Sequence, residues 1–166
     1  MSASDTGKRG RRAPLPPRWV VRAAWAIHRA IFAATGGRRG LRRQTPARWG
    51  MMRLATIGRR SGLERHAILG YFEDGPNLVT MAMNGWGEPE PAWWLNLQAQ
   101  PDTTVELSDG PRAVRGRAAT AEERPRLWAR WAAYDGEEAL ASWASRRPRE
   151  TAVVILEPRN AEPRSA

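Results

Sequence analysis

The chain of 166 residues is long enough for one domain with a buried core, and 42% hydrophobic with 27% charged residues is typical of a globular protein. It has no cysteine, which excludes disulfides, thiolate nucleophiles and zinc sites with cysteine ligands. Its two histidines, His28 and His66, lack the spacing of metal ligands, so we expect no metal site. No apolar run approaches the ~20 residues of a membrane span, and no signal-peptide pattern opens the chain, so we expect a cytoplasmic protein.

The positive charge is concentrated in the first part of the chain. Residues 1–66 hold 16 Lys/Arg and 2 Asp/Glu, a net charge of +14, whereas residues 67–166 carry a net charge of −4. This asymmetry favours an anionic partner, which could be a nucleic acid, an anionic membrane surface or an acidic cofactor.

The first 47 residues read as two segments ahead of the main domain. Residues 1–17 are polar and basic without periodicity, which predicts a disordered arm. Residues 18–47 predict an amphipathic helix that ends at Gly36-Gly37, followed by a basic linker. The helix either packs on the domain or on a second subunit of a homodimer, or lies at an anionic membrane surface that residues 18–43 contact.

Short apolar runs separated by turn residues predict one domain at 48–158 that is mainly β with α, followed by a polar tail at 159–166. Neighbouring runs with short connections favour antiparallel pairing, so we expect a small barrel with helices packed outside. The second helix should begin at a capping box, with Thr120 as N-cap and Glu123 bonding back. The expected elements, in chain order, are strands 51–57, 66–73 and 77–83, a helix at 92–100, strands 103–107 and 112–118, a helix from 120 through 134, and a strand at 151–156.

A basic turn connects the first two expected strands. Gly58 and Gly62 bracket it and allow the backbone to bend tightly. Guanidinium groups, a hydroxyl and free amides together are the chemistry of a cradle for phosphate or carboxylate. The alternative is an ordinary solvated hairpin loop. The side chains of the predicted cradle are those of Arg59, Arg60, Ser61 and Arg65.

Aromatic residues form two further groups. Trp86 lies between two glycines in a loop, a position that core packing rarely uses. Trp128, Trp131 and Tyr134 recur at helical spacing, a pattern more typical of a buried helix face than of a catalytic group. His66, next to the basic turn, reads as a strand residue that makes one hydrogen bond.

The order of these motifs resembles the deazaflavin (F420)-dependent nitroreductase and F420H2-dependent quinone reductase family. The resemblance rests on the basic turn, on the Asn-Gly-Trp-Gly loop at 84–87, on Pro-Ala-Trp-Trp-Leu-Asn-Leu at 91–97 and on the last strand at 152–158, and it covers about residues 48–158. It implies a split β-barrel of about six antiparallel strands. It also implies binding of coenzyme F420, an 8-hydroxy-5-deazaflavin hydride carrier with a phosphate and oligoglutamate tail; FMN is the less favoured alternative.

The resemblance also implies a role for each site residue. Near the helix start this chain departs from the family, because Glu90, Trp94 and Leu95 replace a histidine, a tyrosine and a histidine. A carboxylate beside an anionic tail is unfavourable unless Glu90 points elsewhere, for instance toward an arginine. The implied roles are tail binding by Arg59, Arg60, Ser61, Gly62 and Arg65, contact with the ring and its linker by Asn84, Gly85 and Trp86, closure of the site by Pro91, Trp93, Trp94 and Asn96, walls of the substrate pocket from Trp128 and Trp131, and proton donation by Tyr134.

The leading hypothesis is an F420-dependent oxidoreductase that transfers a hydride from the reduced coenzyme to a quinone, a nitroaromatic or an activated alkene. A second is a non-enzymatic barrel that stores F420 or binds FMN, haem or a fatty acid. A third, an anionic-lipid or nucleic-acid binder, depends on the basic first part of the chain. Nucleic acid is disfavoured because the tryptophan-rich stretches lie mostly outside that part.

Overall fold

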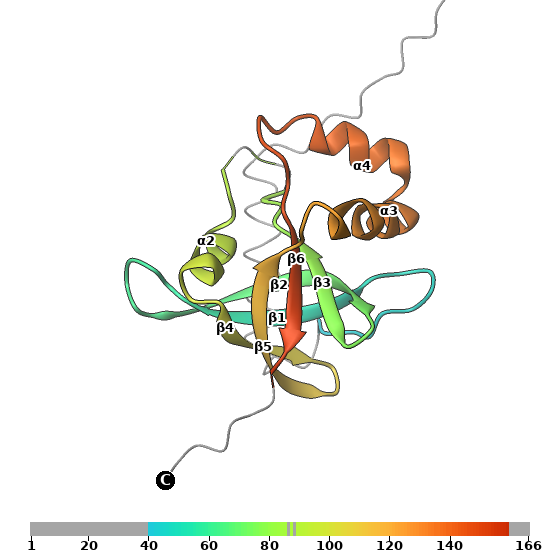
Figure 1. The fold of residues 1–166 in the computed structure, drawn as a ribbon. Coiled ribbons are helices and arrows are strands. Elements are labelled where there is room, and N and C mark those ends of the chain that lie inside the picture. Colours follow the sequence, from blue (N-terminus) through green and yellow to red (C-terminus); the bar gives the residue numbers. More distant parts are fainter. Residues whose placement is uncertain (1–39, 86, 88, 160–166) are drawn as a thin grey trace, which may run out of the picture.

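The computed structural model describes residues 40–85, 87 and 89–159, and this part of the chain forms a closed antiparallel barrel with helices outside it (Figure 1). The strand order around the barrel is β1-β2-β3-β6-β5-β4, and β4 closes onto β1 through the pair Leu54 and Val105. The prediction of a six-stranded antiparallel barrel is therefore confirmed. The described elements are β1 (Gly50–Ile57), β2 (Glu64–Asp74), β3 (Asn77–Met81), α2 (Ala92–Ala99), β4 (Asp102–Leu107), β5 (Gly110–Ala118), α3 (Glu123–Asp135), α4 (Glu137–Ala144) and β6 (Val153–Pro158).

The elements expected from the sequence agree with the structure except for α4, which the pattern did not predict. The capping box ahead of α3 forms as expected: the Glu123 amide donates to Thr120 Oγ1 at 3.3 Å, and the Thr120 amide donates to Glu123 Oε2 at 2.9 Å. The arm at 1–17, the helix expected near 18–35 and most of the polar tail lie outside the described residues. None of the helices in the described part is long and apolar enough to cross a membrane.

Side chains that alternate along the strands fill the barrel interior. Every second residue of β1 is buried, as in a strand with one face toward a core. Helix α2 lies against the barrel and adds Trp93, Trp94 and Leu97 to the same cluster. It approaches β5 closely, because a Cβ on Gly116 would lie 2.4 Å from Leu97 Cδ2. The barrel core therefore fixes the helix that carries one wall of the cavity described below.

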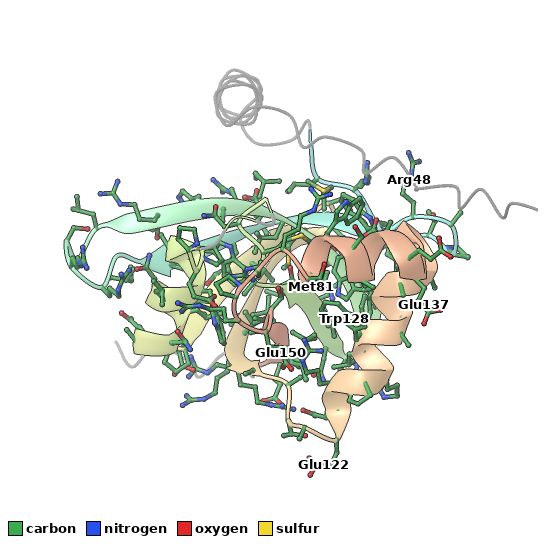
Figure 2. The ribbon with its side chains drawn as sticks, turned by 90° about the horizontal axis from the view of Figure 1, so that it is seen from above. Arg48, Met81, Glu122, Trp128, Glu137 and Glu150 are labelled. Carbon is green, nitrogen blue, oxygen red and sulfur yellow. The ribbon has the colours of Figure 1, made fainter. Side chains whose placement is uncertain are left out.

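A second apolar cluster lies between the outer surface of the barrel and helices α3 and α4. Both helices contribute to it, and Phe72 and Trp131 meet edge to face with ring centroids 5.5 Å apart. Met81 belongs to this cluster and Trp128 packs against it. Figure 2 shows both residues in the region between α3 and the strands. Strand β6 lies between the two clusters and is buried on both faces, which explains why its sequence is continuously apolar.

Candidate functional site

A cavity of about 550 Å³ lies where the β1–β2 turn, the segment after β3 and the start of α2 meet. Figure 1 shows the hairpin of β1 and β2 extending past α2 on the left of the molecule. The cavity brings together eight of the residues predicted from the sequence: Arg59, Arg60, Ser61, Arg65, Asn84, Pro91, Trp93 and Asn96. Five further lining residues had no predicted role in the site: Thr56, Gly58, His66, Ala67 and Ala92.

The backbone of the β1–β2 turn folds back on Gly58. The Gly58 carbonyl accepts hydrogen bonds from the amides of Ser61 at 3.1 Å and Gly62 at 2.7 Å, and its own amide donates to the Leu63 carbonyl at 2.8 Å. Gly62 has φ +67°, a conformation that a residue with a side chain rarely adopts. The tight turn that the sequence predicts is thus present, and it holds Arg59 and Arg60 at the cavity.

The arginines of the cavity differ in their partners from most other arginines. Neither Arg60 nor Arg65 makes a side-chain hydrogen bond or ion pair with another described residue, and no Asp or Glu is among the described residues that line the cavity. Elsewhere in the described part, ten arginines pair with a carboxylate. Unpaired guanidinium groups that converge on one cavity attract an anion, because charge-assisted hydrogen bonds to phosphate or carboxylate are strong.

Asn96 connects α2 to the basic turn. Its side chain is only 5% exposed. Its Oδ1 accepts from the backbone amide of Arg59 at 3.1 Å and from the Arg59 guanidinium at 3.4 Å, and its Nδ2 donates to Thr56 Oγ1 at 3.3 Å. Thr56 in turn donates to the Arg65 carbonyl at 3.4 Å. Asn96 therefore fixes the position of Arg59, because both ends of its amide bond to the β1–β2 hairpin.

The segment between β3 and α2 forms another wall, and Glu90 lies at its end. Glu90 Oε1 lies 3.5 Å from Nη2 of Arg147, whose side chain has no exposed surface. Glu90 thus points toward an arginine, which is the example considered for this carboxylate from the sequence. The carboxylate is neutralised away from the cradle, so it does not oppose an anion in the cavity.

Three described residues that were predicted for the coenzyme site are not among those that line the cavity: Gly62, Gly85 and Trp94. Gly62 and Gly85 act through the backbone, since both have positive φ in the turns that carry Ser61 and Asn84. Trp94 is 5% exposed and packs in the barrel core, whereas its neighbour Trp93 lines the cavity. Trp86 lies outside the described residues.

The aromatic residues of α3 lie in the second apolar cluster and are not among the residues that line this cavity. Trp131 is 1% exposed, and Arg124 lies over the Trp128 ring with its Cζ 4.6 Å from the ring centroid. The Tyr134 hydroxyl accepts a hydrogen bond from Gln44 Nε2 at 2.9 Å. The roles of Trp128, Trp131 and Tyr134 toward substrate stay predictions that the geometry of this cavity does not support.

His66 is a cavity residue that sequence reasoning did not assign to the site. It lies on β2, and its Nε2 is 3.0 Å from Glu64 Oε1. Its position directly after Arg65 was the feature of the sequence that could have assigned it to the site. Among the described residues, no three His, Cys, Asp or Glu side chains gather in the way a metal ion requires.

A closed antiparallel barrel of six strands with helices packed outside it is the split-barrel fold of F420 reductases. The chain belongs to the F420H(2)-dependent quinone reductase family, whose model matches residues 24–158. It is therefore an oxidoreductase, and its cofactor is coenzyme F420.

Two relatives come from Mycobacterium tuberculosis H37Rv. The putative F420H(2)-dependent quinone reductase Rv3178 is 37% identical over 103 residues, which cover 61% of this chain and 83% of the relative. The F420H(2)-dependent quinone reductase Rv1261c is 30% identical over 146 residues, which cover 84% of this chain and 95% of the relative.

Solved structures have the same fold. An F420-H2 dependent reductase, FDR-A, superposes on this chain with a TM-score of 0.56 at 26% identity. The matched region covers 64% of this chain and 93% of the FDR-A chain. A structure described as a domain-swapped dimer superposes with a TM-score of 0.58 at 22% identity, covering 84% and 98%, and this likeness shows the fold alone.

Proposed function

We propose that the cavity between the β1–β2 turn and α2 is the coenzyme site, and that the chain reduces a quinone there with coenzyme F420 as the hydride donor. The observation that carries this proposal is the pair of guanidinium groups of Arg60 and Arg65, which have no acidic partner in the described part of the chain and line a cavity whose described lining holds no carboxylate. The coenzyme tail carries a phosphate and several carboxylates, which are the groups that such a cradle binds.

The remaining lining residues fit the rest of the coenzyme. Trp93 offers an aromatic surface and Pro91 an apolar one, while Asn84 adds an amide. An apolar surface beside one amide, as these three residues provide, is typical of the part of a site that binds a planar ring. When bound, the reduced coenzyme supplies a hydride to the acceptor. The protein then has to bind the tail, orient the ring against the acceptor and exclude water.

A quinone is the acceptor that the family description favours, and nitroaromatics and activated alkenes are the other electrophiles to examine. A planar acceptor needs contact with a hydride donor at van der Waals distance, so shape and stacking contribute more than a conventional catalytic dyad. The titratable residues among the described lining are three arginines and one histidine, so this lining holds no pair of carboxylates for acid–base catalysis.

Contact of residues 18–43 with an anionic membrane, or of the N-terminal helix with a second subunit, stays a proposal, and most of that segment lies outside the described residues. The described arginines of the linker already have partners. Arg42 donates to the Trp49 carbonyl at 3.3 Å and lies over the Trp49 ring, and Arg43 pairs with Asp109 at 2.7 Å. These two contacts favour packing on the barrel over release to a lipid surface.

Steady-state turnover tests the proposed function. We expect the full-length protein to oxidise reduced coenzyme F420 in the presence of a water-soluble quinone, at a rate proportional to protein concentration, and to give no comparable rate with reduced FMN. The absorbance of the oxidised coenzyme reports the reaction. Lack of turnover with a panel of quinones, nitroaromatics and enones, despite coenzyme binding, would contradict the reductase proposal and favour a storage protein.

A further inference from the structure

The side chain of Arg147 is fully buried, although a guanidinium is costly to remove from water. It follows α4 and lies on none of the elements that form the cavity. A hydrophobic side chain of similar volume would fill the same space at less cost in desolvation. The use of an arginine here therefore requires a role beyond packing.

The guanidinium bonds to three separate segments. Its Nη1 donates to the Ala82 carbonyl at 3.0 Å and to Thr151 Oγ1 at 2.8 Å, and its Nη2 lies 3.5 Å from Glu90 Oε1. Ala82 directly follows β3, Glu90 precedes α2, and Thr151 precedes β6. A planar group with donors in fixed directions sets the relative positions of these segments, which a flexible apolar side chain does not do.

Two of these contacts lie next to residues of the cavity. Asn84 follows Ala82 by two positions, and Pro91 follows Glu90 directly; both line the cavity. The Pro91 carbonyl accepts the first helical hydrogen bonds of α2, from Trp94 at 3.0 Å and Leu95 at 3.3 Å. The position of Glu90 therefore sets where α2 begins, and with it the placement of the cavity residues that α2 carries.

We propose that Arg147 is a positioning residue for the coenzyme site, which holds both ends of the segment between β3 and α2 in the geometry that binds the ring. Together with Ala82, Glu90 and Thr151 it forms the Arg147 anchor. The inference rests on the proposed function of the cavity. It assigns a role in the site to a residue that is 57 positions from Glu90 in sequence and touches neither the cavity nor a ligand.

The test compares Arg147→Met, Arg147→Lys and Glu90→Gln with a matched control, Arg124→Met. Arg124 also approaches the start of β6, where its Nη2 donates to the Thr151 carbonyl at 3.0 Å and its Nε bonds to Glu150. Its side chain makes no hydrogen bond or ion pair with the described residues of the segment between β3 and α2. Each full-length variant is titrated with oxidised coenzyme F420 well below its Tm, and hydrogen exchange of amides at 82–85 and 92–95 is measured without coenzyme.

We expect Arg147→Met to weaken coenzyme binding by about tenfold or more, because small misplacements of binding groups are costly. Arg147→Lys should recover part of the affinity, since its ammonium still reaches toward Glu90, and Glu90→Gln should weaken binding in the same direction. Exchange at 82–85 and 92–95 should rise with the same rank order. Arg124→Met should keep its affinity within about twofold, as expected for a distant site.

Two results would overturn the inference. One is a folded Arg147→Met variant that has the coenzyme affinity and the hydrogen exchange of the parent. The other is a loss of affinity in Arg124→Met as large as that in Arg147→Met. If Arg147→Met does not fold, Glu90→Gln and Arg147→Lys decide the question by the same two measurements. If the parent protein binds no coenzyme, that result contradicts the proposed function and not the inference. The hydrogen-exchange measurement then still decides whether the Arg147 anchor orders the segment between β3 and α2.

Discussion

Asn96 joins α2 to β1 and to the β1–β2 turn across the cavity. Its amide is bonded at both ends, to Arg59 and to Thr56, while the residue itself is buried. A buried amide with satisfied bonds specifies one arrangement of its neighbours. Asn96 thus acts on an anion indirectly, through the position of Arg59.

Asn96→Ala removes these bonds and leaves Thr56 Oγ1 without its donor. We expect the free energy of unfolding to fall by about 1–3 kcal/mol, measured by urea denaturation. Coenzyme affinity should also fall, because the Arg59 amide loses its partner. Gln98→Ala, at an exposed position of the same helix, is the control and should leave both quantities unchanged. Equal behaviour of the two variants would show that the Asn96 contacts do not order the turn.

Tyr134 has two interpretations that one substitution separates. Its hydroxyl accepts from Gln44, and its ring stacks on Phe72 with centroids 6.4 Å apart. From these contacts we expect Tyr134→Phe to lower stability by about 1 kcal/mol and to leave kcat unchanged. A tenfold or greater loss of kcat with an unchanged Tm would instead support the role of proton donor that the family resemblance implies.

At the scale of elements, Arg117 joins β5, α3 and β6. It bonds to Glu123 through two parallel contacts of 2.6 and 2.8 Å and to Glu157 at 2.7 Å. The Arg117 guanidinium, followed by the Thr120 amide, lowers the pKa of Glu123 to about 2. The same carboxylate therefore caps α3 and ties it to the barrel.

This lowered pKa predicts a pH dependence of stability. The ordinary pKa of such a carboxyl is 4.5, so the unfolded chain binds the proton first as the pH falls. The contribution of Glu123 is therefore fully present above about pH 4.5 and is lost as the pH falls toward 2. Because the pair is partly exposed, we expect Glu123→Gln to cost only about 1 kcal/mol at neutral pH.

Tm measured between pH 7 and 2 checks this. The Tm of Glu123→Gln should fall less steeply than that of the parent below about pH 4.5. Glu138→Gln, an exposed position on α4, serves as the control and should follow the parent. Parallel curves for the parent and Glu123→Gln would contradict the assignment of this pKa to the Arg117 contact.

At the scale of the whole molecule, the sequence predicts the barrel well because its strands alternate, its turns are short and its last strand is continuously apolar. Helix α4 escaped prediction for a local reason. Gly136, with φ +86°, ends α3 and immediately precedes α4. A glycine after a helical pattern indicates an end, and α4 has only eight residues with one buried side chain, Leu140.

The site was predictable where its residues are contiguous in sequence. The basic turn and the start of α2 supplied seven of the eight predicted lining residues, and the loop after β3 supplied Asn84. Contacts between residues that are far apart in the sequence were not predictable. Asn96 and Arg59 are 37 positions apart, and Glu90 and Arg147 are 57 positions apart. The sequence suggested an arginine as one possible partner for Glu90, but nothing in it indicated which of the many arginines this would be.

The most direct test of the central claim is an equilibrium titration with oxidised coenzyme F420, followed by fluorescence. It compares the parent, Arg60→Ala/Arg65→Ala and the charge-matched control Arg115→Ala/Arg126→Ala, whose arginines pair with Asp102 and Asp74 rather than lining the cavity. We predict saturable binding by the parent and the control, and a loss of about tenfold or more in the cradle variant, about 1.4 kcal/mol. Equal affinity of the two double variants would contradict the assignment of the cavity as the site of the coenzyme tail.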